Sequence, residues 1–410
     1  MSGLVSKLDE FLNTDRLRAW NHVLAAALLV CILGFLALSS HGIDPTGKPL
    51  GTDFTSFYAA SQLTLAGHPE SAYDPAVHGA AQNAIFGREV GYAAYFYPPL
   101  FLLICLPLAL LPYLWSLAIW QGLTFAAYAR VVRRFAGPGL DALAIATFPA
   151  VLINLGHGQN AFLSAALFGA GLLSLNTRPV LAGVLLGCLA YKPQLGIVIP
   201  FALIAARRWD TFAAAGATVV ALAALATFAF GTEIWRAFLA NMPLAGAVLE
   251  QGLVDAYKMQ STYAAVRVIG GTHAAACIIQ GLVSVSALTA LVWVIMRTPR
   301  GDVEAPVMAL AALLVSPFLL DYDLVILALP LAWLYAQARR TGFMPHEKLV
   351  MLAAFVLPLV ARTLAKGAHL PLAPLVIAAL FAVVVRRLLR DVAVESAPPL
   401  ASQLHPALGA

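Results

Sequence analysis

Apolar residues in this chain come in long uninterrupted runs rather than in alternation with polar residues. Residues 24–38, for example, read L-A-A-A-L-L-V-C-I-L-G-F-L-A-L. A helix needs ~20 mostly apolar residues to cross a bilayer, whereas a transmembrane barrel would show ~10-residue strands of alternating polarity. The pattern therefore predicts an all-α polytopic membrane protein with about twelve transmembrane helices. The predicted spans are 22–39, 112–131, 140–155, 160–175, 179–191, 194–206, 211–230, 273–296, 303–317, 322–337, 348–363 and 371–387.

The composition supports this class. Of the 410 residues, 61% are hydrophobic and only 11% are charged, and the mean hydropathy is +0.84. A soluble globular chain carries about 25% charged residues, so this chain has too little polar surface to face water on all sides. The first apolar run follows Asp9, Glu10 and Asp15, unlike the short basic region that leads a cleaved signal peptide. We therefore expect a retained first span.

The basic residues predict the orientation of the chain. Lys and Arg are enriched in cytoplasmic loops of membrane proteins, and every Arg-Arg doublet falls on the cytoplasmic side when the N-terminus is placed there. Twelve spans then return the C-terminus to the same side. The net charge of +5 follows from this bias and does not indicate a nucleic-acid partner. The doublets are Arg133-Arg134, Arg207-Arg208, Arg339-Arg340 and Arg386-Arg387.

This topology divides the chain into three parts. Residues 1–21 form a cytoplasmic N-terminal segment, residues 22–390 form the transmembrane domain, and the proline-rich residues 391–410 form a disordered cytoplasmic tail. Two long outer loops are predicted at 40–111 and 231–272. Within the first, F-Y-P-P-L-F-L-L-I-C-L-P-L-A-L-L-P (96–112) is apolar but contains four prolines, so we interpret it as a re-entrant or interfacial segment rather than a span.

Unusual polar residues gather in the segments predicted to face outward. A carboxylate with apolar neighbours, as at Asp53, is a candidate general base, and Lys192 could neutralise a phosphate. The amides of Gln159, Asn160 and Gln194 could hold a sugar. This combination fits glycosyl transfer from a lipid-phosphate donor, and it also fits a transporter for an anionic solute. The segments are G-T-D-F-T-S-F-Y (51–58), Y-F-Y-P-P (95–99), G-H-G-Q-N (156–160), Y-K-P-Q (191–194) and D-Y-D (321–323).

Each of these residues also has a purely structural interpretation. Asp53 could cap the helix that begins with F-T-S-F-Y, and Asp321 and Asp323 could cap the helix that follows them. Lys192 could extend to the membrane interface. His157 could be a loop histidine whose hydrogen bonds are made by the backbone. The four cysteines stand singly in apolar runs and are read as small packing residues.

An ordered set of motifs resembles glycosyltransferase family 87, the GT-C membrane transferases that include polyprenyl-phosphate-mannose-dependent α-1,2-mannosyltransferases. The resemblance covers about residues 50–330. The motifs are D-F-x-x-F-Y-A-A with L-A-G-x-x-x-x-A-Y-D (53–74), Y-x-Y-P-P (95–99), G-Q-N (158–160), A-G-V-L-L-G-x-x-x-x-K-P-Q (182–194) and S-P-x-x-x-D-Y-D (316–323).

The resemblance implies a GT-C fold and an inverting transferase in the plasma or inner membrane. It would move a sugar, in the leading case mannose, from a polyprenyl-phosphate donor to a lipid or glycan acceptor at the periplasmic or outer face. Asp53 matches the family's first-loop aspartate and would be the general base. Phe54 and Tyr58 would wall the site or stack on a sugar. Tyr97, His157, Asp321 and Asp323 complete the expected substrate contacts. Lys192, with Arg236, Lys258 and Arg267 as further candidates, would stabilise the departing phosphate.

The chain departs from the family in one place. Some members carry a histidine in the late outer loop, where this chain reads S-P-F-L-L-D-Y-D, and His157 is a candidate substitute. Apart from D-Y-D (321–323), which has no further acidic neighbours, no D-x-D motif occurs, and this suits a reaction without a metal ion or other cofactor. Two other hypotheses remain at this point, a transporter or flippase of an anionic or lipid-linked solute and a non-catalytic membrane scaffold.

Overall fold

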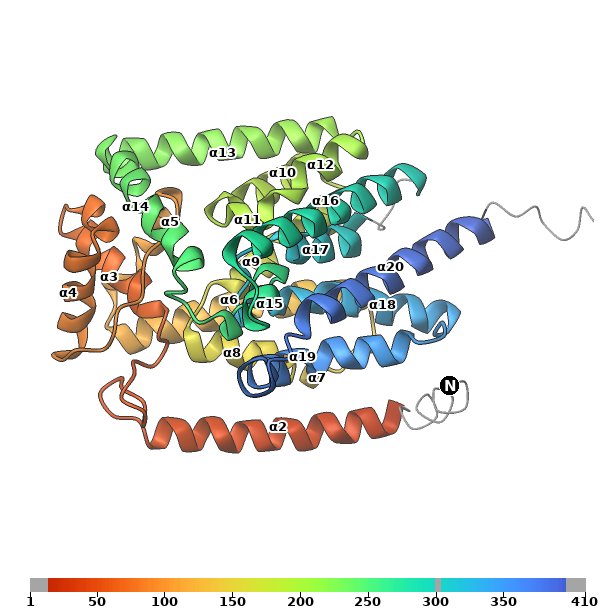
Figure 1. The fold of residues 1–410 in the computed structure, drawn as a ribbon, viewed down its shortest axis with the longest axis horizontal. Helices are drawn as coiled ribbons and strands as arrows, with labels where there is room; N and C mark the ends of the chain where they lie inside the picture. Colours follow the sequence, from red (N-terminus) through yellow and green to blue (C-terminus); the bar gives the residue numbers. More distant parts are fainter. Residues whose placement is uncertain (1–13, 299–303, 396–410) are drawn as a thin grey trace, which may run out of the picture.

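The computed structural model describes residues 14–298 and 304–395. Its regular structure in these ranges is helical, with three isolated β-bridges beside the helices. Residues 1–13 of the expected N-terminal segment and residues 396–410 of the expected tail lie outside the described residues. In Figure 1 most long helices run along the long axis of the molecule, and a group of shorter helices from the first outer segment stands at one end.

The first half of the chain forms that end group and about half of the long-helix layer. In chain order its elements are α2 (Thr14–Ala37), α3 (Phe54–Leu65), η1 (Pro69–Tyr73), α4 (Pro75–Phe86), α5 (Leu100–Cys105), η2 (Leu108–Leu110), α6 (Tyr113–Ala136), α7 (Ala142–Ala146), α8 (Pro149–His157), α9 (Ala161–Ser174), α10 (Pro179–Gly187), η3 (Cys188–Tyr191), α11 (Pro193–Gly196) and α12 (Val198–Ala205).

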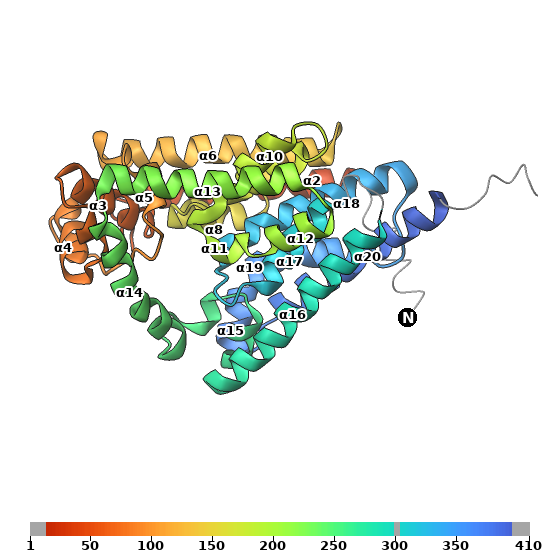
Figure 2. The same ribbon diagram turned by 90° about the horizontal axis from the view of Figure 1, so that it is seen from above.

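The second half completes the layer and packs back on α8 and α9. Figure 2 shows α14 leaving the α3–α5 end and reaching toward α15. The elements are α13 (Trp209–Phe230), α14 (Glu233–Glu250), η4 (Ala256–Lys258), α15 (Thr262–Val268), α16 (His273–Arg297), α17 (Glu304–Val315), η5 (Asp321–Leu327), α18 (Ala328–Thr341), α19 (Glu347–Ala368) and α20 (Ala373–Glu395).

Each of the twelve predicted spans coincides with helix, but the count of twelve is not confirmed. Within the described residues, four helices are long and apolar enough to cross a membrane: Ala19–Ala37, Trp209–Phe230, His273–Arg297 and Glu347–Ala368. Several other predicted spans are shorter or are divided, as at η5 and α18. The proline-rich segment 96–112 holds only the six-residue α5 and the three-residue η2, which is too short for a continuous span. The two long segments predicted as outer loops, 40–111 and 231–272, carry their own helices rather than irregular structure.

The core of the larger part of the molecule surrounds α17. All residues of this helix are buried, from Glu304 to Val315, and it packs against α9, α12, α16, α18 and α20. A helix that is apolar on every side is expected in such a central position. A second, aromatic cluster lies at the α3–α5 end, where Phe57 and Phe101 are among the buried rings.

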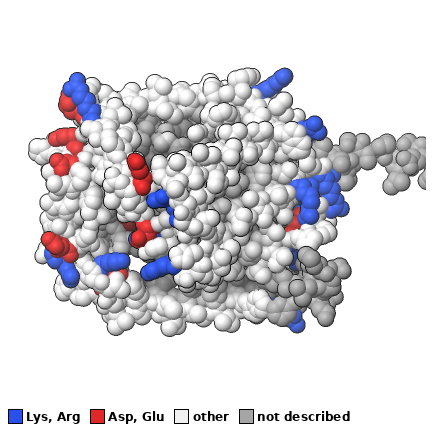
Figure 3. Space-filling view, viewed as in Figure 1, with Lys and Arg blue, Asp and Glu red and all other residues white. Residues whose placement is uncertain are grey.

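On the face shown in Figure 3, charged side chains gather at the two ends and in a smaller group between the left end and the centre, and a nearly uncharged band separates that group from the right end. At the end opposite α3 and α4, Arg134, Glu304 and Arg340 line one cavity, and Arg208 pairs with Glu304. Three of the arginine doublets therefore share one end. The polar residues singled out from the sequence lie toward the other end, where α8 and η5 meet α3.

Candidate functional site

The first outer segment and the end of α8 are joined through their backbones. α8 ends at His157, and Gly158 follows in the left-handed conformation with a φ of +65°. The Asp53 amide donates to the His157 carbonyl over 2.9 Å. A Cβ on Gly158 would lie 2.6 Å from the Cβ of Phe54, so only glycine permits this close approach. The contact fixes Asp53 beside the turn between α8 and α9.

Asp53 stands at the N-cap position of α3, but its side chain forms no capping hydrogen bond. Its Oδ2 accepts from Gln159 Nε2 at 3.2 Å, and its Oδ1 accepts from the Thr52 hydroxyl at 3.4 Å. His157 Nδ1 lies 3.7 Å from Oδ1, and the Asp53 side chain is 31% exposed. The geometry therefore favours an accessible, oriented carboxylate over a helix cap.

The amide of Gln159 is fixed in one orientation by its neighbours. Its Oε1 accepts from the Tyr97 hydroxyl at 3.1 Å and from the backbone amide of Asn160 at 2.7 Å. Nε2 must therefore be the end that faces Asp53, and it also donates to the Tyr322 hydroxyl at 3.1 Å. With only 4% of its surface exposed, Gln159 is placed to position the carboxylate rather than to meet a sugar directly.

His157 lies between carboxylates from two parts of the chain. The Thr52 hydroxyl and His157 Nδ1 are 2.8 Å apart, and the ring centre is 5.8 Å from that of Tyr322. Burial lowers the pKa of His157, but the neighbouring carboxylates of Asp53 and Asp321 outweigh burial, so the pKa is raised overall. His157 thus links Asp53 electrostatically to Asp321.

Asp323 and Lys192 form a buried ion pair. Their Oδ1 and Nζ atoms are 2.7 Å apart, and the side chains are 5% and 3% exposed. The Lys192 ammonium also lies 5.4 Å from the centre of the Tyr322 ring. Its charge is therefore already balanced within the protein, which weakens the expectation that it meets a donor phosphate.

Asp321 faces a different cation. Its Oδ2 is 3.4 Å from Arg362 Nη1 in α19. Burial raises the pKa of Asp321, and the charges of His157 and Arg362 oppose that rise. Within residues 14–298 and 304–395, no group of three or more His, Cys, Asp or Glu residues could hold a metal ion.

Phe54 and Tyr58, the two aromatic residues predicted to line the site, are buried. Phe54 is 0% exposed and Tyr58 is 6% exposed, and the rings of both lie against Tyr113, with centres 5.5 and 5.2 Å away. The structure places them in packing positions rather than at an open surface. Tyr97 is half-buried, and its hydroxyl donates to Gln159 Oε1 over 3.1 Å.

The two remaining amides differ in their surroundings. Asn160 is 0% exposed, and neither polar atom of its side chain has a hydrogen-bond partner among the described residues. Gln194 is half-buried in α11, outside the hydrogen bonds that hold Asp53. Of the two, only Asn160 directly adjoins Gln159.

The chain is similar to a known protein family. The model of glycosyltransferase family 87 matches residues 95–317, more than half of the chain. The chain belongs to glycosyltransferase family 87. No curated protein and no solved structure matches it.

The family assignment makes this a membrane glycosyltransferase, a protein that uses a sugar donor and an acceptor. The matched segment contains Tyr97, His157, Gln159 and Lys192. Asp53 lies before it, so the family match itself does not assign the carboxylate a role.

The basic residues expected at the glycosyltransferase's site are scattered. Arg236 pairs with Glu233 on the surface of α14, and Arg267 donates to the carbonyl of Gly271 within its own loop. Lys258 lies over Tyr257.

Sequence reasoning missed Arg362 and Lys366 of α19, which the structure brings beside Tyr257. A signal for them was present in the sequence. They stand four residues apart, on one face of a helix, at an end where the predicted topology disfavours basic residues.

Proposed function

We propose that this protein is an inverting glycosyltransferase with Asp53 as its general base. It moves a sugar, in the leading case mannose, from a polyprenyl-phosphate donor to a lipid or glycan acceptor. The reaction takes place at the periplasmic or outer face of the plasma or inner membrane. The family assignment supports the glycosyl transfer, and the resemblance of the motifs supports the donor class.

One observation carries the role of Asp53. Three carboxylates lie around the α8–α9 turn, and two of them are buried beside cations: Asp323 with Lys192, and Asp321 with Arg362. Asp53 has no Lys or Arg partner among the described residues and keeps about a third of its side chain exposed, 31%. A general base must reach a substrate proton, and Asp53 is the carboxylate of the three with that access.

The proposed step is a single displacement. Asp53 accepts the proton of an acceptor hydroxyl, and the acceptor oxygen forms a bond to the anomeric carbon of the sugar. The bond between that carbon and the phosphate oxygen breaks, and polyprenyl phosphate leaves with the electron pair. Attack opposite the leaving group inverts the anomeric centre, so a β-linked donor gives an α-glycoside.

The distribution of charge supports the proposed orientation. Arg134, Arg208 and Arg340 stand at the last turn of α6, just before α13 and at the last turn of α18, and these helix ends lie away from the α3–α5 group (Figure 1). A basic end is expected on the cytoplasmic side. The Asp53 site would then face the opposite leaflet, where a lipid-linked donor can present its sugar.

The test is transfer from radiolabelled polyprenyl-phosphate-mannose in membranes that contain the protein, with GDP-mannose as the alternative donor. We expect a labelled product from the lipid donor, with an α linkage. Transfer from GDP-mannose alone would overturn the donor class. Movement of the intact labelled lipid across the bilayer, with no new glycosidic bond, would instead favour a flippase.

Removing the Gln159 amide should slow the proposed reaction without weakening donor binding. In Gln159→Met the side chain keeps about its length, but Asp53 Oδ2 loses its donor at 3.2 Å. A hydrogen bond to a charged group contributes about 1.5–3 kcal/mol, so we expect kcat to fall about tenfold or more. The KM for the donor should change little. A raised donor KM with an unchanged kcat would show that Gln159 binds substrate instead of positioning the base.

A further inference from the structure

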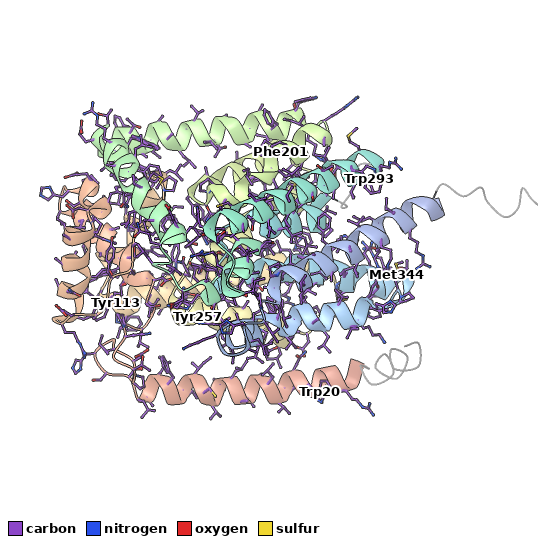
Figure 4. All side chains as sticks on the ribbon, in the orientation of Figure 1. Trp20, Tyr113, Phe201, Tyr257, Trp293 and Met344 are labelled. Carbon is purple, nitrogen blue, oxygen red and sulfur yellow. The ribbon has the colours of Figure 1, made fainter. Side chains whose placement is uncertain are left out.

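Three basic side chains converge on one tyrosine beside the Asp53 site. Around the Tyr257 ring, Lys258 Nζ lies 5.9 Å from the centre, Arg362 Cζ 6.0 Å and Lys366 Nζ 5.4 Å. Lys258 comes from η4, and the other two come from α19, which packs against η4. We call these three cations with Tyr257 the Tyr257 cluster. Figure 4 labels Tyr257, and Figure 3, in the same orientation, shows basic and acidic atoms close together in that part of the face.

The protein balances this positive charge only in part. Asp255 accepts from the Tyr257 hydroxyl and pairs with Lys258, each at 2.8 Å. Within the described part of the chain, Arg362 has a single carboxylate contact, to Asp321 at 3.4 Å. Lys366 forms no ion pair with a described residue, and its side chain is exposed. Arg362 and Lys366 therefore present unused donors to an anion.

Three like charges around one ring repel one another, although water weakens this repulsion, since the side chains of Lys258 and Arg362 are 37% and 41% exposed and Lys366 is exposed as well. Their position is also unusual, since the predicted topology puts them at the outer end, where basic residues are disfavoured. A bound anion would reduce the repulsion between the three cations and would neutralise basic residues in this unusual position. Arg and Lys are the side chains that recognise phosphate oxygens.

The cluster adjoins the proposed catalytic base through a short series of contacts. Asp53 lies 3.7 Å from His157, and His157 acts on Asp321 through its charge. Asp321 in turn contacts Arg362. α19 packs directly on α8 and on η5, so the elements that carry the base and the cations adjoin one another. An inverting displacement needs two separate groups, because nucleophile and leaving group lie on opposite sides of the anomeric carbon.

We propose that the Tyr257 cluster binds the phosphate group of the lipid donor and stabilises it as it leaves, with Arg362 and Lys366 as the main contacts. This inference rests on the proposed function. When the glycosidic bond breaks, the phosphodiester becomes a phosphomonoester of charge about −1.5 to −2. Cations placed where charge develops stabilise the transition state. Lys192, 3% exposed and paired with Asp323, is not needed for this role.

The test measures binding of fluorescent polyprenyl phosphate, which carries no sugar, to the full-length protein in nanodiscs. We expect Lys366→Gln with Arg362→Gln to weaken binding at least tenfold. Polyprenol, which lacks the phosphate, should bind wild type and variant equally. Arg236→Gln and Arg267→Gln are matched controls, since both remove outer-side cations outside the cluster. Lys366→Gln alone changes an exposed side chain that pairs with no carboxylate of residues 14–298 and 304–395, so it gives a variant whose folding is not at risk.

The outcomes separate this inference from the proposed function. Unchanged affinity in the double variant would overturn the role of the cluster, even if the wild type transfers sugar. Competition by phosphatidylglycerol as strong as that by polyprenyl phosphate would also overturn it, because the cluster would then bind bulk lipid headgroups. Competition by inorganic phosphate in the wild type but not in the double variant would support it. Binding that is lost in the double variant but kept in Asp53→Asn supports the cluster whether or not transfer is detected.

Discussion

Replacement of Asp53 by asparagine should lower sugar transfer by about 10²–10⁴-fold, the usual contribution of a general base. Asparagine has nearly the same shape, but it cannot accept the proton of an acceptor hydroxyl. Because the Asp53 side chain caps no helix and its backbone amide still donates to His157, the fold should be retained. The measurement is initial rate of transfer from labelled polyprenyl-phosphate-mannose, normalised to the amount of folded protein.

The matched control is Glu70→Gln. Glu70 belongs to the same segment, its side chain is 45% exposed, and it pairs with His68 among the described residues. This change should leave the rate within a factor of about two, as expected for a surface substitution. Equal rates in wild type and Asp53→Asn would exclude Asp53 as the base. Asp321 would then be the next carboxylate to replace, because it also borders His157.

Much of the helical framework could be predicted from the sequence. Long apolar runs such as the one in α13 specify helices by composition alone, and each predicted span contains helix. The sequence did not predict equally well how many of these helices cross the membrane. Short apolar helices such as α9 and α17 are packed inside the protein, so their hydrophobicity reflects burial by neighbours as much as contact with lipid.

Part of the candidate site was also open to prediction. Asp53, His157 and Gln159 stand in short polar motifs between apolar runs, and the structure brings them into contact. The hydrogen bonds among these residues could not be predicted from the motifs. A motif identifies Gln159 as polar, but only the hydroxyl of Tyr97 and the amide of Asn160 fix which end of its side chain faces Asp53.

The charge partners depend on contacts distant in sequence. Lys192 and Asp323 are 131 residues apart, and Asp321 and Arg362 are 41 apart. No local spacing specifies either pair. Phe54 and Tyr58 illustrate the same limit, because aromatic residues beside a catalytic carboxylate look alike in sequence whether they line a site or fill the core.

The pair of Lys192 and Asp323 should be essential for stability. Lys192→Met would leave the carboxylate of Asp323 buried without its cation, and breaking such a pair costs about 3–5 kcal/mol. We expect the free energy of unfolding in detergent to fall by about this amount. Asp323→Asn should have a similar effect, because it leaves a buried ammonium instead. The double variant should recover most of the loss, since it leaves no unpaired buried charge.

The double variant also decides between two roles for Lys192. If Lys192 only balances Asp323, the refolded double variant keeps its affinity for polyprenyl phosphate, as expected when the Tyr257 cluster holds the phosphate. If Lys192 meets the donor, the double variant is stable but binds polyprenyl phosphate weakly. An unchanged free energy of unfolding in Lys192→Met would contradict the buried pair itself. Stability and binding must therefore be measured on the same variants. The Lys192 side chain is only 3% exposed, so its loss can slow the reaction either by destabilising the fold or by weakening donor binding.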